Sequence, residues 1–272
     1  MSITHEQPSF ARKAYLRKLQ RRKILINTGR VLILVLFIAL WEILTAQRVI
    51  DPFIFSSPSR VLKTLSNLSE NGELWKHIST SLIETVSGFS IGTASGILIA
   101  VILWWSPFLS GVLEPHLIVL NALPKTALGP IFIVCMGAGT GSIIAMTLAI
   151  SLIVTILNVL NGFLQTDMEK VRLLRIFGAG KVQIFTKLVL PANLSAIVNV
   201  MKVNIGLSWV GVITGEFLVS KAGLGYLIVY GSQVFKMDLV MASVLILAVF
   251  ALIMHLAIVM LERFVRRHFD LK

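Results

Sequence analysis

Long apolar runs separated by polar stretches dominate the chain, and they predict membrane-spanning helices. A helix needs about 20 mostly apolar residues to cross a bilayer. The runs of that kind cover about residues 30–46, 81–105, 107–137, 141–163, 192–218 and 239–262. The pattern therefore predicts an all-α, polytopic membrane protein with about six transmembrane helices, in which a basic arm at 1–29 precedes a membrane domain at 30–272.

Two of these runs have internal features that predict how the helices pack. Gly88, Gly92 and Gly96 are four residues apart, so they lie on one helical face and allow a neighbouring helix to approach closely. The 107–137 run contains Pro115, Pro124 and Pro130 after its first residue, and prolines inside a helix interrupt it. A broken helix inside a membrane survives where protein or water satisfies its freed backbone groups, so this span is expected to line an interior.

Composition and charge support the membrane assignment. Hydrophobic residues make up 56% of the chain and charged residues 14%, against about 25% charged in soluble domains. The net charge of +12 comes mainly from Lys and Arg blocks at 12–30, 170–187 and 263–272. With six spans, the positive-inside rule places the N-terminus, the 164–191 loop and the C-terminus in the cytoplasm, with the first block against anionic lipid. The sequence shows no basic groove with interleaved aromatic residues, so it does not favour nucleic-acid binding.

The chain offers little of the chemistry that enzymes use. Its one cysteine, Cys135, excludes an internal disulfide and a Cys-based zinc site. His116 and His255 lie alone in apolar runs, without the company that metal ligation needs. Motifs of the His-Glu-x-x-His or Gly-x-Ser-x-Gly kind do not occur. We therefore expect no catalytic residue, no metal and no cofactor.

The stretch GAGKVQIFTKLVLP at 178–191 begins like the end of a phosphate-binding loop. A P-loop has the pattern G-x-x-x-x-G-K-[ST], and its last hydroxyl holds magnesium. If Gly180-Lys181 ended such a loop, its first glycine would fall at Arg175 and its hydroxyl at Val182. Both positions fail, and no strand-like run precedes them, so nucleotide binding here is rejected.

The 164–191 loop instead has the pattern of two short helices around a turn. Asp167 is a predicted helix cap. An apolar stripe follows at three-residue spacing, formed by Met168, Val171, Leu174 and Phe177. Gly178 and Gly180 are expected to make the turn through positive φ angles. Lys181 is expected to be a solvated or partner-facing charge.

The second helical piece contains Ile184, Phe185 and Leu188 on one side, and Pro191 is expected to begin the fifth span. This pattern fits a rigid segment that receives force from a partner. It fits equally well a membrane-surface helix that has no partner.

The loop resembles the cytoplasmic signature loop of ABC-importer permeases, which runs E-A-A-x-x-x-G, nine residues, then I-x-L-P. Gly178, Leu188 and Pro191 fall at matching positions, whereas Arg172-Leu-Leu stands in place of Glu-Ala-Ala. The resemblance implies a type I importer permease in the bacterial cytoplasmic membrane. It implies three kinds of partner: ABC ATPase subunits, an extracytoplasmic solute-binding (lipo)protein and a second permease copy, most simply a homodimer.

Other phrases are similar to the nitrate/sulfonate/taurine branch of these permeases. They are SPSRVLKTL, GELWKHISTSLIETVSGFSIG, ALPKTALGPIFIVCMGAG, GLSWVGVITGEFL and GLGYLI. Their order and spacing cover about residues 55–268. The branch implies a small anionic or heterocyclic solute.

Site residues follow partly from this resemblance and partly from intramembrane polarity. For coupling to the ATPase the candidates are Arg172, Gly178, Gly180, Leu188 and Pro191. For the solute pathway they are Lys125, Asn204, Ser208 and Glu216, because polar groups inside a membrane are costly and tend to face an interior. The alternatives are structural: Lys125 could form a salt bridge with Glu114 or Glu216, and Glu216 could cap an external segment.

A different class of protein is also compatible with six spans. An ion-gradient-driven secondary transporter or channel would work without an ATPase. It predicts several intramembrane acids and an internal repeat. The acids within the spans are few and no repeat is apparent, so the importer permease is the favoured hypothesis.

Overall fold

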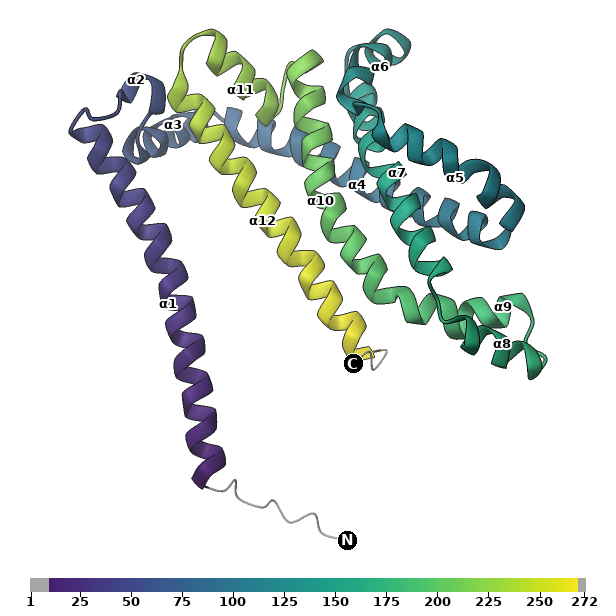
Figure 1. The fold of residues 1–272 in the computed structure, drawn as a ribbon. Helices are drawn as coiled ribbons and strands as arrows, with labels where there is room; N and C mark the ends of the chain where they lie inside the picture. Colours follow the sequence, from purple (N-terminus) through teal and green to yellow (C-terminus); the bar gives the residue numbers. More distant parts are fainter. Residues whose placement is uncertain (1–9, 269–272) are drawn as a thin grey trace. The chain divides into compact units, whose positions relative to one another are not determined.

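The computed structural model describes residues 10–268, and within that range every regular element is a helix. The described chain divides into two compact units, one ending at Lys63 and the other beginning at Thr64 (Figure 1). The predicted all-α class is confirmed. Residues 1–9 of the predicted arm and residues 269–272 lie outside the described range.

In the first unit, α1 (Phe10–Ala46) is one helix with no break between the predicted arm and the first predicted span. Two short structures follow, α2 (Pro52–Phe55) and the beginning of α3 (Pro58–Glu70). Asp51 starts α2 by accepting the Phe53 N–H at 2.8 Å.

The first turn of α3 has two caps. The Ser57 hydroxyl accepts the Arg60 N–H at 3.3 Å. The Glu42 carboxylate accepts the Ser59 N–H at 3.0 Å, so α1 and α3 are joined within this unit. Glu42 is therefore a capping group.

The second unit is a helical bundle. It contains the end of α3 followed by α4 (Glu73–Trp105), α5 (Pro107–Ala122), the 3-10 helix η1 (Lys125–Leu128), α6 (Gly129–Met136), α7 (Thr140–Leu164), α8 (Met168–Ile176), α9 (Lys181–Ile184), the π-helix η2 (Phe185–Val189), α10 (Leu190–Val219), α11 (Leu224–Gln233) and α12 (Met237–His268). In Figure 1, α8 and α9 lie at one end of this unit and α11 lies at the opposite end.

Five of the helices are long and apolar enough to cross a membrane, and the α5–η1–α6 pair, bent by 90°, makes a sixth candidate. This agrees with the predicted six spans and with the predicted break in the third. The second span begins earlier than predicted, at Glu73 instead of about residue 81. The hydropathy pattern missed its first two turns because five of the residues 73–80 are polar, and Glu73, Lys76 and Ser79 are exposed.

Helices α4, α7 and α10 form the centre of the bundle. Three glycines on α4 face three hydroxyl residues on α7, and a Cβ added to any of them would lie within 2.6 Å of the opposing side chain. The contacts pair Gly88 with Thr147, Gly92 with Ser151, and Gly96 with Thr155. The predicted close approach at these glycines is confirmed, and small residues set the separation of the helices.

Helix α10 completes this centre through polar and ionic contacts. The Asn204 side-chain amide donates to the Thr93 hydroxyl at 3.0 Å and to the Thr155 hydroxyl at 2.7 Å. On its other side, the Lys202 ammonium lies 2.6 Å from the Glu262 carboxylate of α12. This pairing explains how a charged residue is accommodated in the fifth span.

Candidate functional site

Helix α8 begins where the sequence predicts. The Asp167 carboxylate accepts the Glu169 N–H at 2.9 Å, which satisfies one of the free donors of the first turn. This hydrogen bond is the main reason why the pKa of Asp167 lies below its usual range, and the Lys170 ammonium at 3.5 Å acts in the same direction. The cap is therefore strongest when the carboxyl is ionised.

The predicted apolar stripe of α8 does not form a single face. Val171 is buried, and Leu174 packs against the same core cluster. Met168 and Phe177 are exposed, Phe177 to 77%. On an α-helix, a step of three residues falls about 60° short of a full turn. A stripe at three-residue spacing therefore moves half-way round the helix over nine residues.

The outward side of α8 is apolar and basic at once. Ile176 is 81% exposed and Leu173 is also exposed. Arg172 and Arg175 lie exposed on the same helix. An apolar surface of this kind, flanked by cations, is suited to contact with another protein or with lipid.

The two glycines of the turn play different roles. Gly178 has φ +81°, a conformation that side chains disfavour, and its N–H donates to the Arg175 carbonyl at 2.9 Å. Gly180 has φ −71° and ψ 166°, which any residue adopts. The prediction of a positive φ is confirmed for Gly178 and wrong for Gly180, which instead precedes α9 and donates its N–H to the Gln183 side chain.

Pro191 lies in the first turn of α10, as predicted, but no separate helix begins there. Residues Lys181–Val219 are one continuous helix. The π-helix η2 lets this happen, because the Leu190 N–H donates to the Phe185 carbonyl five residues back and the chain accommodates a proline that has no N–H. Leu188 packs against the core cluster within this turn.

Lys181 is exposed, in agreement with the predicted solvated charge, and it also has partners within the chain that were not predicted. Its ammonium donates to the Trp105 carbonyl, the last of α4, at 2.5 Å. It also lies 5.8 Å from the ring centroid of Trp104 and 5.6 Å from that of Trp105. The segment after the turn is therefore attached to the end of α4.

Lys125 lies at the break in the third span and is half-buried. Its ammonium donates to the Asn121 carbonyl at 3.1 Å and to the Asn121 side-chain oxygen at 2.9 Å. In the described chain, this contact stands in place of the two predicted salt bridges. It satisfies a carbonyl that the end of α5 leaves without a helical partner.

The other predicted pathway residues lie inside the bundle. Asn204 and Ser208 are completely buried, and Glu216 is 1% exposed. Within the described chain, the Asn204 side-chain oxygen and the Ser208 hydroxyl have no hydrogen-bond partner. The three lie at different depths along α10, and the ammonium of Lys125 instead contacts Asn121.

Glu216 joins α10, α4 and α11. Its carboxylate accepts the Ser81 hydroxyl at 2.5 Å and the Gly225 N–H at 2.5 Å. The Ser81 hydroxyl accepts the Leu224 N–H at 2.7 Å. The first turn of α11 is therefore held by side chains from two spans, and Glu216 does cap an adjoining segment as the structural alternative predicted.

The loop before α11 is held in a similar way. Gly223 donates its N–H to Nδ1 of His77 at 3.0 Å. This residue has φ +116°, and a Cβ there would lie within 2.5 Å of both carboxylate oxygens of Glu216. Only glycine fits at this position, for conformational and steric reasons together.

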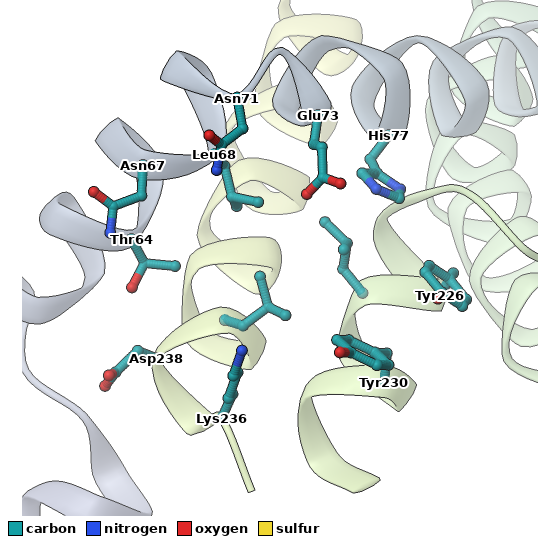
Figure 2. A pocket seen from close by; sticks show the side chains of 12 residues that line it. Thr64, Asn67, Leu68, Asn71, Glu73, His77, Tyr226, Tyr230, Lys236 and Asp238 are labelled. Atoms are coloured by element: carbon teal, nitrogen blue, oxygen red, sulfur yellow. The ribbon is translucent and has the colours of Figure 1, made fainter. Parts of the chain in front are cut away.

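A hollow of about 600 Å³ lies beside this network, at the α11 end of the unit (Figure 2). Its lining comes from α3, α4, α11 and the beginning of α12, namely Thr64, Asn67, Leu68, Asn71, Glu73, His77, Tyr226, Leu227, Tyr230, Lys236, Asp238 and Leu239. The rings of His77 and Tyr226 stack at 5.8 Å, and those of Tyr226 and Tyr230 at 5.9 Å. Stacked aromatic rings beside charges of both signs can receive a polar protein surface or a small polar solute.

The sequence-based selection missed the α4 side chains of this network. His77, Ser81 and Glu84 are buried at the start of the second span. Their spacing of four and then three residues places the three polar side chains on one face of the helix. That spacing is a usable signal, but the predicted second span begins at about residue 81 and so separates His77 from Ser81 and Glu84.

Comparison with known proteins gives a consistent result. The family model for "Binding-protein-dependent transport system inner membrane component" matches residues 92–267. A probable ABC transporter permease protein of Haemophilus influenzae is 28% identical, over 86% of this chain and 95% of its own. A putative aliphatic sulfonates transport permease protein, SsuC of Bacillus subtilis, is 26% identical over 83% of this chain and 82% of its own.

The fold has a counterpart among solved structures. A chain of the MetNI methionine ABC transporter, in inward-facing conformations, superposes with a TM-score of 0.58 at 19% sequence identity. The match covers 75% of this chain and 97% of that one. It supports the permease fold independently of sequence similarity.

Proposed function

The chain belongs to the family of binding-protein-dependent transport system inner membrane components, and on this premise we propose that it forms the solute pathway of an ATP-driven importer. In this proposal a separate ATPase hydrolyses ATP, and an external binding protein delivers the solute. The 164–191 segment receives the ATPase. The chain itself alternates between conformations, and each conformation binds a different state of the ATPase. The chain makes and breaks no covalent bond.

The exposed tip of α8 is the observation that supports coupling most directly. Ile176 and Phe177 are exposed to 81% and 77% at the α8–α9 end. Val171 on the inward side fixes α8 to the bundle, and Lys181–Val219 leads without a break into the fifth span. A partner that binds the tip therefore moves α10 directly.

Charge indicates what this partner offers. The family's loop has Glu where this chain has Arg172, and Arg172 and Arg175 are both exposed beside the tip. A cleft on the ATPase with acidic groups at its rim would pair with these two arginines. The contact that the family's glutamate makes cannot form in this chain. We assign this end of the bundle to the cytoplasm, in agreement with the basic blocks of the sequence.

The broken third span supports a second permease copy. Around its break, Asn121, Leu123 and Thr126 are exposed, and the backbone leaves the helical pattern at Leu123. Irregular backbone and polar groups at membrane depth require cover by protein or by a water-filled path. A second copy facing this surface supplies cover by protein and encloses a water-filled path. The solute path then lies between the two copies, with Lys125 beside it.

The opposite end, which contains α11 and the hollow of Figure 2, then faces outward toward the binding protein. For the solute we propose a small anion of the sulfonate class, because a relative is named for aliphatic sulfonates. Asn204, Ser208 and Glu216 would meet the solute only after the packing around them opens, since all three are buried in this conformation.

Reconstitution tests the proposal. The permease is purified with its ATPase, placed in liposomes and supplied with binding protein and candidate sulfonates. We expect solute-loaded binding protein to stimulate ATP hydrolysis and uptake to require ATP. Uptake by the permease alone, driven by an ion gradient, would instead establish the secondary transporter.

A further inference from the structure

The ammonium of Lys181 occupies the C-terminal end of α4. That end leaves carbonyls without helical partners and has a partial negative charge, which a cation stabilises. Lys181 donates to the Trp105 carbonyl at 2.5 Å, although the two residues are 76 positions apart. Its ammonium also lies over the rings of Trp104 and Trp105, at 5.8 and 5.6 Å from their centroids. All three contacts are with the last two residues of α4.

Phe185 strengthens the same attachment one helical turn later. Its ring centroid lies 5.0 Å from that of Trp104 and 6.2 Å from that of Trp105. It also lies 5.6 Å from Phe163 near the end of α7. Residues four apart on a helix share a face, so Lys181 and Phe185 hold α9 and η2 against α4 and α7 together.

At its other end, α4 is fastened to α11. His77 accepts the Gly223 N–H, and Ser81 accepts the Leu224 N–H. Helix α4 is continuous between these contacts and Trp105. A displacement of the 164–191 segment can therefore reach α11 by two routes, through α10 as a continuous helix and through α4 by way of Lys181.

We propose that Lys181 is a positioning residue that makes α4 follow the 164–191 segment, so that α4, α10 and α11 move as one group. This inference rests on the proposed function, since it assumes that an ATPase moves the segment. Without Lys181, α10 moves with the ATPase while α4 lags behind. ATP is then hydrolysed with little solute transported.

The test compares Lys181→Met with Lys181→Arg and with a matched control, Lys187→Met. Lys187 is an exposed lysine in the same segment. In proteoliposomes with ATPase and loaded binding protein, we expect Lys181→Met to lower uptake per ATP hydrolysed by about tenfold, the effect of losing one charge-assisted hydrogen bond. Copurification of the ATPase and basal hydrolysis should stay at wild-type levels, and Lys181→Arg should recover most of the ratio.

A purely local capping role would lower the stability of the complex and leave uptake per ATP unchanged, and that result would overturn the proposal. An equal loss of uptake per ATP in Lys187→Met would overturn the proposal as well. The effect would then come from removing any positive charge from the segment, not from the contact of Lys181 with α4. If the wild-type complex itself shows no ATP-dependent uptake, the proposed function fails before the variants are compared.

A covalent bridge provides a second measurement that does not depend on the Met variant folding. Cysteines replace Lys181 and Trp105 in a Cys135→Ala chain, and a short bis-maleimide joins them. If α4 follows the segment, bridging should restore uptake per ATP toward the wild-type value. If the two elements must separate during transport, bridging will abolish the remaining uptake and refute the inference.

Discussion

Gly211 lies where α10 passes against the backbone of α7, and its replacement by alanine tests the packing at the centre of the bundle. The added Cβ would lie 2.6 Å from Cα of Thr147, and an ordinary contact needs 3.4 Å or more. The helices would have to separate by about 0.8 Å, because no side-chain rotation moves a backbone atom. Overpacking of this kind costs about 1–3 kcal/mol.

Gly206 provides the matched control on the same helix. A Cβ at Gly206 meets nothing within 4 Å. Alanine raises helix propensity by about 1 kcal/mol at either position, so the difference between the two variants isolates the contact with Thr147.

The assay is heating in detergent followed by size-exclusion chromatography of the remaining folded protein. We expect Gly206→Ala to match or exceed the wild-type apparent melting temperature. Gly211→Ala should melt roughly 5 °C below Gly206→Ala, at about 2–4 °C for each kcal/mol. Equal melting temperatures for the two variants would show that α7 and α10 do not meet in this register.

Three further outcomes are expected at the 164–191 segment. Phe177→Asp should lower ATPase copurification at least about tenfold while leaving the melting temperature unchanged, because it charges an exposed apolar surface; unchanged copurification would remove Phe177 from the docking surface. Gly178→Val should abolish ATP-driven uptake, because valine is strained at φ +81°; normal uptake would contradict the coupling role. Because a hydrogen bond lowers the pKa of Asp167, its contribution to α8 is complete above the ordinary aspartate pKa of about 3.9 and is lost as pH falls through the lowered value. Intrinsic-rate-corrected amide exchange at the start of α8 should therefore rise at acid pH in the wild type, whereas Asp167→Asn, which keeps a capping oxygen without titrating, should show no such rise.

The helices of the second unit were largely predictable because membrane insertion imposes a strong rule on sequence. A span must be long and apolar, and a break in it must contain prolines or polar residues. The 107–137 run showed both features, and the structure breaks there between α5 and η1. The start of α4 is missed because polar residues dominate its first two turns, and hydropathy cannot distinguish a polar residue in a loop from one in a helix.

The candidate site was predictable to a smaller extent. The Asp167 cap and the positive φ of Gly178 follow from local chemistry, and both are confirmed. The ordinary φ of Gly180 and the attachment of Lys181 to Trp105 were not foreseen. A glycine can adopt either conformation, and a lysine has several possible acceptors, so neither choice is determined by neighbouring residues.

The sequence by itself determined the helical class, the approximate spans and the family resemblance, because each depends on residues near one another in the chain. Only the tertiary structure decided which polar groups meet. Ser81 and Glu216 are 135 positions apart, and Lys181 and Trp105 are 76 apart, yet each pair shares a hydrogen bond. Such pairs depend on the rotation and depth of packed helices, which are set where small residues let α4, α7 and α10 approach closely.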